Sequence, residues 1–152
     1  MEQSEDGGNV IIEVDPHSEV PIYQQLRDRV VEAIATGALR AGDPLPSTRA
    51  LATDFGINFH TVNKAYDLLR QQGLLRINRK SGAVVLRDGD SGPPTPGFVP
   101  EWTARATTLL AEATAHGLGR EELLELCRSV LDGFDSGPDR VSTGPTRKGD
   151  ER

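Results

Sequence analysis

Residues 56–58 limit the folds open to this chain more strongly than any other stretch. Gly56 ends one apolar stripe, and Asn58 stands just before the next. A glycine can adopt the left-handed conformation that ends a helix, and an asparagine can accept a backbone N–H at the start of the following one. Ile57 and Val62 have the spacing of a hydrophobic staple around that start. The pattern predicts two short helices joined by a tight turn, a helix-turn-helix.

An apolar stripe with i, i+4 spacing predicts another helix before this motif, from Val20 to about Gly37. The stripe consists of Ile22, Leu26, Val30 and Ile34. Residues 10–15, VIIEVD, are β-prone and are expected to form one strand ahead of this helix. Residues 40–47, RAGDPLPS, are expected to form a loop after it.

The two helices of the motif carry their own start and stop signals. Ser47 is a suitable N-cap for the first helix, which has Leu51 and Phe55 on one face. The second helix is expected to end at Gly73. Its inward residues are expected to be Val62, Ala65, Tyr66 and Leu69.

Two β-prone runs, LLRIN and AVVL, follow on either side of Arg79-Lys80-Ser81-Gly82. This arrangement predicts a β-hairpin with a basic tip. The order helix, helix-turn-helix, hairpin predicts a winged helix-turn-helix domain over residues 10–87. The fold class is therefore expected to be α+β and mainly α.

The rest of the chain divides by composition. Four further segments are expected: a disordered N-terminus at 1–9, a proline-rich linker at 88–100, a two-helix dimerisation region at 101–132 and a disordered tail at 133–152. Within the two-helix region, one helix is expected to begin near Trp102 and the other near Arg120.

Charge is unevenly distributed along the 152 residues. The formal net charge is -6, but residues 20–87 hold ten basic and five acidic residues and so carry +5. A basic segment in an acidic chain indicates contact with nucleic acid. The chain has one cysteine, Cys127, so an internal disulfide is excluded and a reducing cytoplasm is expected. The absence of a run of about eighteen apolar residues argues against a membrane span.

Catalytic and metal-binding patterns are not apparent. The histidines His17, His60 and His116 are scattered and have no cluster of cysteines or acids beside them. A glycine-rich phosphate loop and a nucleophile constellation are also absent from the sequence. We therefore expect a protein that is not an enzyme and has no cofactor and no metal.

Several motifs together resemble GntR-type bacterial transcription regulators. They are the Pro21-Ile22-Tyr23 start, the loop GALRAGDPLPSTR, and the helix from Thr61-Val62 to Tyr66 that ends at Gly73, all within about Val20 to Leu86. The later stretch LLAEATAHGLGREELLELCRSVLD resembles the C-terminal piece of the YtrA-like subfamily. LPSTRALA also occurs in MocR-like regulators, but the length argues against their aminotransferase domain. The subfamily resemblance implies a dimeric repressor, often of an operon for an ABC transporter.

The expected partner is double-stranded operator DNA. The N-terminal half of the second motif helix is expected to enter the major groove, where Asn63 suits adenine and His60 suits a base edge. Lys64 is expected to reach a phosphate or a guanine. Phe59 is expected either to meet a thymine methyl or to pack on the domain. The resemblance implies that Arg49 clamps a phosphate or a base.

Other candidate contacts serve the DNA backbone. Thr48 and Thr61 are expected to offer hydroxyls and first-turn amides to phosphates. Arg79 and Lys80 at the wing tip are expected to make nonspecific or minor-groove contacts, with simple solvation as the alternative. The Asn58-Phe59-His60 triplet departs from the Asn-x-Asn that is common in the subfamily, so the resemblance implies no operator sequence.

The apolar residues of the two-helix region exceed what two short helices can bury alone. We expect a two-fold dimer that reads a palindromic operator, with recognition helices about 34 Å apart. The interface residues are expected to be Leu109, Leu110, Leu123, Leu124, Leu126, Cys127, Val130 and Leu131. A core position and a redox-sensing thiol are alternatives for the cysteine. A small apolar effector between the two-helix region and the winged domain is a further hypothesis, and a nonspecific or architectural DNA-binding protein is the alternative function.

Overall fold

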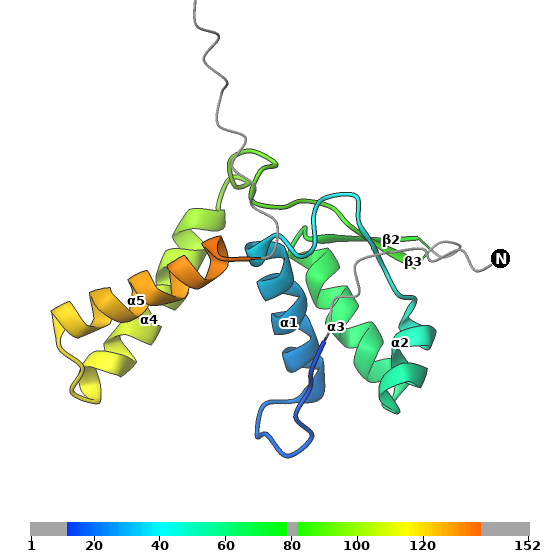
Figure 1. The fold of residues 1–152 in the computed structure, drawn as a ribbon, viewed down its shortest axis with the longest axis horizontal. Coiled ribbons are helices and arrows are strands. Elements are labelled where there is room, and N and C mark those ends of the chain that lie inside the picture. The colour runs from blue at the N-terminus through cyan, green and yellow to red at the C-terminus, as the bar shows by residue number, and fades with distance from the viewer. Residues whose placement is uncertain (1–11, 79–81, 138–152) are drawn as a thin grey trace, which may run out of the picture.

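The computed structural model describes residues 12–78 and 82–137, and it confirms the predicted fold class (Figure 1). A winged helix-turn-helix is followed by two further helices. In chain order the elements are α1 (Ile22–Thr36), β1 (Pro44–Leu45), α2 (Thr48–Phe55), α3 (Phe59–Gln71), β2 (Leu75–Asn78), β3 (Gly82–Val85), α4 (Phe98–Ala115) and α5 (Arg120–Asp135). The strands form one antiparallel sheet in the order β1-β3-β2.

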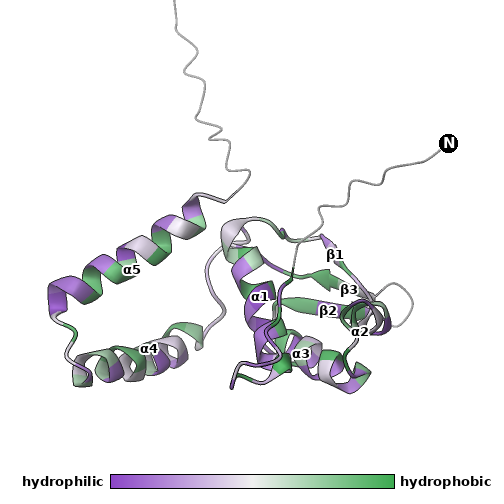
Figure 2. Cartoon of the chain, turned by 60° about the horizontal axis from the view of Figure 1, so that its bottom comes forward, coloured by the Kyte–Doolittle hydropathy of each residue, from purple (hydrophilic) through white to green (hydrophobic). Residues whose placement is uncertain are grey.

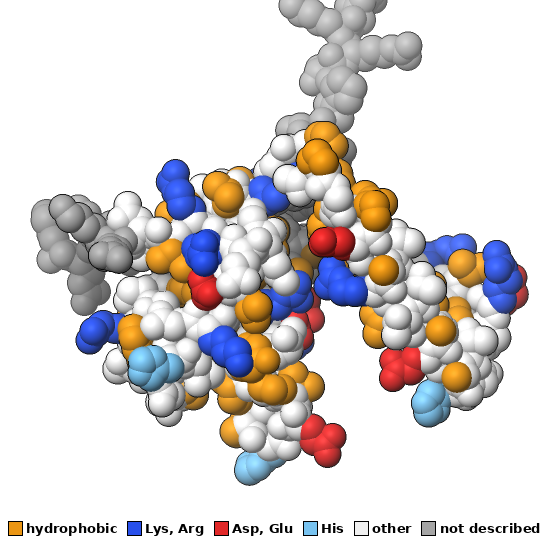
Figure 3. Space-filling model, turned by 180° about the vertical axis from the view of Figure 1, so that it is seen from behind, with side chains coloured by type: hydrophobic (Ala, Val, Ile, Leu, Met, Phe, Trp, Pro, Cys, Tyr) orange, Lys and Arg blue, Asp and Glu red, His pale blue; other side chains and the backbone are white. Residues whose placement is uncertain are grey.

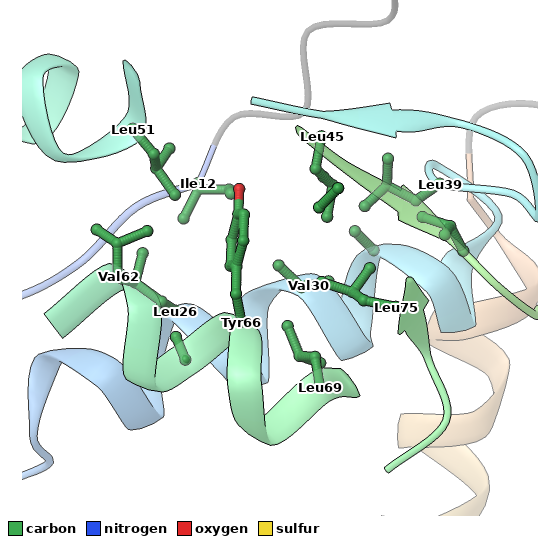
Figure 4. Packing of buried hydrophobic residues seen from close by; sticks show 14 of the residues in the cluster. Ile12, Leu26, Val30, Leu39, Leu45, Leu51, Val62, Tyr66, Leu69 and Leu75 are labelled. Atoms are coloured by element: carbon green, nitrogen blue, oxygen red, sulfur yellow. The ribbon is translucent and has the colours of Figure 1, made fainter. Parts of the chain in front are cut away.

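The core of the winged domain forms around the predicted inward face of α3. Val62, Ala65, Tyr66 and Leu69 are all buried, as expected. Tyr66 lies at the centre of the cluster (Figure 4), and its hydroxyl donates a 2.7 Å hydrogen bond to the carbonyl of Pro46. Burial raises the pKa of Tyr66, so the hydroxyl remains a proton donor. The bond satisfies the buried phenol and ties α3 to the segment before α2.

The predicted helix boundaries of the winged domain are confirmed by their hydrogen bonds. The Ser47 hydroxyl accepts a bond from the N–H of Ala50 at 3.1 Å, which caps α2. The Asn58 side chain accepts from the N–H of His60 at 2.9 Å, which caps α3. Gly37 ends α1 in the left-handed conformation, with φ of 81°. These local signals therefore place the helices where the sequence predicts them.

The strand predicted for residues 10–15 is wrong for its described part, residues 12–15. The side chain of Gln25 on α1 binds this segment instead. Its Oε1 accepts from the N–H of Asp15 at 2.7 Å, and its Nε2 donates to the carbonyl of Asp15 at 2.9 Å. Ile12 is buried in the core. Ile12 and Val14 are apolar because they pack on the domain, and for residues 12–15 the Gln25 side chain takes the place of a partner strand.

The segment 40–47 is also more ordered than the predicted loop, because it contains β1. This two-residue strand pairs with β3 in antiparallel register. The N–H of Gly42 donates to the carbonyl of Val85 at 2.8 Å, and the N–H of Val85 donates to the carbonyl of Asp43 at 2.9 Å. The pairing partners are distant in sequence, so the local pattern contains no sign of this strand.

Helices α4 and α5 form a helical hairpin, here called the arm, beside α1 (Figure 1). Helix α4 begins at Phe98, inside the predicted linker, and contains Pro100 in its first turn. A proline is tolerated there because first-turn N–H groups have no partner within the helix. Helix α5 extends to Asp135, beyond its expected end. Gly137 then approaches α1 so closely that a Cβ atom would collide with the carbonyl of Thr36.

The packing of α3 can be tested by truncating one side chain. Leu69→Ala should lower the free energy of unfolding by about 3 kcal/mol, because Leu69 is 0% exposed and its loss leaves a cavity. Urea denaturation measures this value. Leu68→Ala is the matched control, since Leu68 is only half-buried on the same helix, and it should cost less than half as much. Equal losses would contradict the observed packing.

Candidate nucleic-acid interface

The turn between α2 and α3 is built on Gly56, which has φ of 62° and ψ of 32°. The N–H of Gly56 donates to the carbonyl of Thr53 at 3.3 Å, and the N–H of Ile57 donates to the carbonyl of Ala52 at 3.0 Å. These two bonds satisfy the last carbonyls of α2 and reverse the chain direction. As a result, the start of α3 lies beside α2 at the surface of the winged domain.

Three of the predicted contact residues meet at this junction. The guanidinium carbon of Arg49 lies 5.2 Å from the ring centroid of Phe59, in a cation–π contact. The rings of Phe59 and His60 meet edge to face with centroids 5.6 Å apart. Phe59 is half-buried against the core, which agrees with the packing role considered for it. Arg49 and Phe59 also line an open depression of about 570 Å³.

Lys64 has a partner that the sequence prediction missed. Its ammonium nitrogen lies 3.9 Å from the centre of the Tyr23 ring, in the first turn of α1. The contact joins α1 to α3 while Lys64 itself remains exposed. Tyr23 belongs to the Pro-Ile-Tyr start of the domain, but that motif contains nothing that points to Lys64. A contact between two helices cannot be read from the pattern of either one.

The remaining polar candidates lie at the starts of the two motif helices. Thr48 is the first residue of α2, and Thr61 lies in the first turn of α3; both are half-buried. His60 is exposed, and Asn63 one turn later is half-buried. The described residues therefore place hydroxyl, imidazole and amide groups along the N-terminal half of α3, next to Arg49.

The wing adds an exposed cation, Arg76 on β2, that the sequence prediction missed. Arg76 pairs with Val84 of β3, whereas its neighbour Leu75 is buried on the other face of the sheet. Alternation along the strand was the signal that could have identified it. Arg79 and Lys80, the predicted wing-tip contacts, lie outside the described residues.

An acidic residue on α3 is neutralised within the helix. The Arg70 side chain donates to the Asp67 carboxylate, with Nη2 and Oδ1 2.6 Å apart. This hydrogen bond holds the pKa of Asp67 below its usual range, so the carboxylate stays ionised and paired. Pairing reduces the repulsion that Asp67 would exert on a nearby phosphate.

Figure 3 shows one face of the molecule, with blue Lys and Arg side chains spread over the winged domain and orange hydrophobic side chains along the arm. In residues 12–78 and 82–137, no three His, Cys, Asp or Glu side chains are grouped so that they could hold a metal ion. Over the same part of the chain, none of the helices has the length and apolar character needed to cross a bilayer. The site consists of exposed cations, rings and amides on a helix-turn-helix.

Comparison with known proteins agrees with this geometry. Residues 22–85 match the family described as bacterial regulatory proteins, gntR family. The chain is 39% identical over 75 residues to the HTH-type transcriptional repressor YtrA of Bacillus subtilis, a match that covers 49% of this chain and 58% of that protein. The chain therefore spans little more than half the length of that relative.

Two solved structures extend the comparison. YtrA from Sulfolobus acidocaldarius, described as a GntR-family transcription factor, is 38% identical; the match covers 64% of this chain and 98% of that one, with a TM-score of 0.50. A transcriptional antiterminator from Listeria monocytogenes EGD-e is 24% identical and has a TM-score of 0.77 over 86% of this chain and 97% of that one. The second similarity shows that the fold, including the arm, is shared.

The turn can be tested at Gly56. Gly56→Ala should lower the free energy of unfolding by about 1 kcal/mol, because a side chain at φ of 62° disfavours the left-handed conformation. An added Cβ would meet nothing within 4 Å, so the loss measures backbone strain alone. Gly89→Ala, with open space and no positive φ, should be neutral or slightly stabilising. Equal changes in thermal denaturation would contradict this account of the turn.

Proposed function

Because the chain belongs to the gntR family of bacterial regulatory proteins, we propose that it is a sequence-specific DNA-binding transcriptional repressor that acts as a homodimer. The observation that carries the proposal is the helix-turn-helix, which gathers Arg49, Phe59 and His60 at the exposed start of α3. A helix presented by its N-terminal half is suited to the major groove. The similarity to a protein named as a transcriptional repressor favours repression as the direction of control.

Binding strength and base reading are divided between different residues in this proposal. Arg49 and Lys64 supply positive charge to phosphates, and Thr48 and Thr61 add backbone contacts. His60 and Asn63 read base edges, because imidazole and amide groups can donate and accept there. The ring of Phe59 supports Arg49 through their 5.2 Å contact. Weak charge on the first turns of α3 is therefore compatible with tight binding.

The arm is the proposed dimerisation element. Leu109 is 65% exposed and Leu126 is 50% exposed, because no other described part of the chain covers these positions on α4 and α5. The hydropathy colouring of Figure 2 shows green residues along both α4 and α5. The other exposed members of the predicted interface are Leu110, Leu124, Cys127, Val130 and Leu131, and Leu123 is half-buried. Because Cys127 is exposed, the alternative that placed it in the core of a single chain is wrong.

A dimer held by the arms would carry two copies of α3 and would read a palindromic operator. The subfamily resemblance puts transporter operons first among the targets to examine. DNA upstream of the protein's own gene is the first probe, since it can be obtained without knowing the targets. Arg76 and the wing-tip cations would add contacts outside the major groove.

The contact surface can be tested by removing two cations. The double substitution Arg49→Ala with Lys64→Ala should weaken binding to the upstream DNA by roughly a hundredfold or more, because two charge-assisted contacts to DNA are lost. Gel shifts at fixed salt measure the change. The matched control is Arg29→Ala with Arg128→Ala. These two arginines are exposed and paired with Glu32 and Glu125, and this variant should bind the DNA nearly as well as the unaltered chain.

Competition with unrelated DNA decides between the two candidate functions. A specific regulator should prefer its own site by about a thousandfold or more. Equal competition by unrelated DNA would favour the nonspecific or architectural alternative. Full binding by the double variant would show that the contact surface lies elsewhere.

The dimer can be tested with a charge in the arm. Leu126→Glu should give monomers in light scattering, because an unpaired carboxylate would have to be buried in the interface. Val20→Glu, a similar change at an apolar position of comparable exposure in the winged domain, should leave the dimer intact. Circular dichroism checks that both variants fold. A stable dimer of Leu126→Glu would remove this face of the arm from the interface.

A further inference from the structure

A cavity of about 750 Å³ lies where the arm joins the winged domain. Its walls come from the second half of α1, the end of α3 with the turn that follows, and the segment from the end of β3 to the start of α4. The apolar side chains that line it include Val31, Ile34, Ala35, Leu74, Leu86 and Phe98. Both structural units therefore contribute to one open cavity with mostly apolar walls.

The charged groups at this cavity already have partners. The Arg87 guanidinium donates to the carbonyls of Gly92 and Pro93 at 2.9 and 3.1 Å. The Asp88 carboxylate accepts from the N–H of Ala41 at 2.8 Å, a bond that lowers the pKa of Asp88. The two charges are opposite and adjacent in the chain, so they offer no net charge to a ligand. This arrangement favours a neutral ligand over an ionic one.

The other polar side chains of the lining are the amides of Gln71 and Gln72 and the hydroxyl of Thr95. Gln72 already accepts a hydrogen bond from Arg27 through Oε1, and Gln71 donates one to Asp67 through Nε2. Each glutamine therefore retains one amide atom that can orient a ligand. A cavity with mostly apolar walls and a few polar groups, of between about 300 and 1,000 Å³, is typical of small-molecule sites. Leu86 is 51% exposed and Phe98 is 45% exposed, so an apolar ligand would cover both.

We propose that this cavity binds a neutral, largely apolar small molecule that regulates DNA binding. The inference rests on the proposed function for its regulatory meaning. Because Phe98 begins the arm and Ile34 belongs to the winged domain, ligand affinity depends on how these two units are placed relative to each other. In a dimer held by the arms, that placement sets the distance between the two copies of α3. The ligand shifts DNA binding by its difference in affinity between two placements.

The experiment uses the full chain and N-phenyl-1-naphthylamine, a neutral apolar fluorophore. Trp102 is the single tryptophan of the sequence and lies one helical turn beyond Phe98. Energy transfer from Trp102 to the fluorophore therefore reports binding near the cavity. We expect saturable binding of one fluorophore per chain.

Leu86→Asp should weaken this binding by at least about tenfold, because it places a carboxylate in the apolar wall. Ile77→Asp is the matched control, since Ile77 is 41% exposed on β2 and does not line the cavity, and it should leave the affinity unchanged. Thr95→Phe narrows the cavity without adding charge and should also weaken binding. Circular dichroism verifies the folding of all three variants.

The regulatory part is tested by repeating the titration with the upstream DNA. The factor by which saturating fluorophore changes DNA affinity should equal the factor by which DNA changes fluorophore affinity. An unchanged DNA affinity overturns the regulatory role. Equal fluorophore binding by the unaltered chain and by Leu86→Asp overturns the site. The absence of saturable binding also overturns it, and would mean that a second copy or other residues of the chain fill the cavity. A chain that binds no DNA overturns the proposed function and the regulatory role with it, while the Leu86 comparison still decides whether the site exists.

Discussion

Burial of the inward face of α3 is the interaction on which the rest of the winged domain depends. Helices α1 and α2 and strand β2 all pack against this helix. Tyr66 extends the contact through its hydroxyl, which holds the segment before α2 by its carbonyl at Pro46. With one face of α3 fixed on several sides, the opposite face is held in a defined orientation at the surface. The surface residues of α3 therefore form a site rather than a set of independent side chains.

The junction of α2 and α3 shows how packing and binding chemistry share residues. Phe59 follows the cap of α3 and is half-buried, yet its ring also supports the guanidinium of Arg49. The Lys64 ammonium rests on Tyr23 in a similar way. Each cation is held by a ring that belongs to the folded domain. In the proposed contact with DNA, this would reduce the side-chain entropy lost on binding a phosphate. The turn at Gly56 makes this possible because it brings two helix ends together.

The arm differs from the winged domain in how little of its surface is buried within one chain. Its helices are regular, but none of their residues is fully buried in the described part of one chain. The arm meets the winged domain at its base, where Gly137 lies against Thr36 and where the apolar cavity is found. In the proposed dimer, the arm would pack against a second copy, and its junction with the winged domain would connect assembly with the spacing of the two copies of α3. Its energetic coupling depends on the difference between two placements of these units.

Local signals were sufficient to predict the helix-turn-helix, since capping at Ser47 and Asn58, the left-handed Gly56 and the apolar stripes involve residues within one or two turns of each other. The contact residues proposed on α2 and α3 rest on helical periodicity and the resemblance, and they stay a prediction. Contacts between distant segments were not predictable in this way. The pairing of β1 with β3, the hold of Gln25 on residues 12–15, the Lys64–Tyr23 contact and the cavity at the base of the arm each require two segments that meet only after folding. The sequence thus specified the elements and their faces, whereas tertiary packing decided which faces meet, because a short-range pattern holds no information about a partner far along the chain.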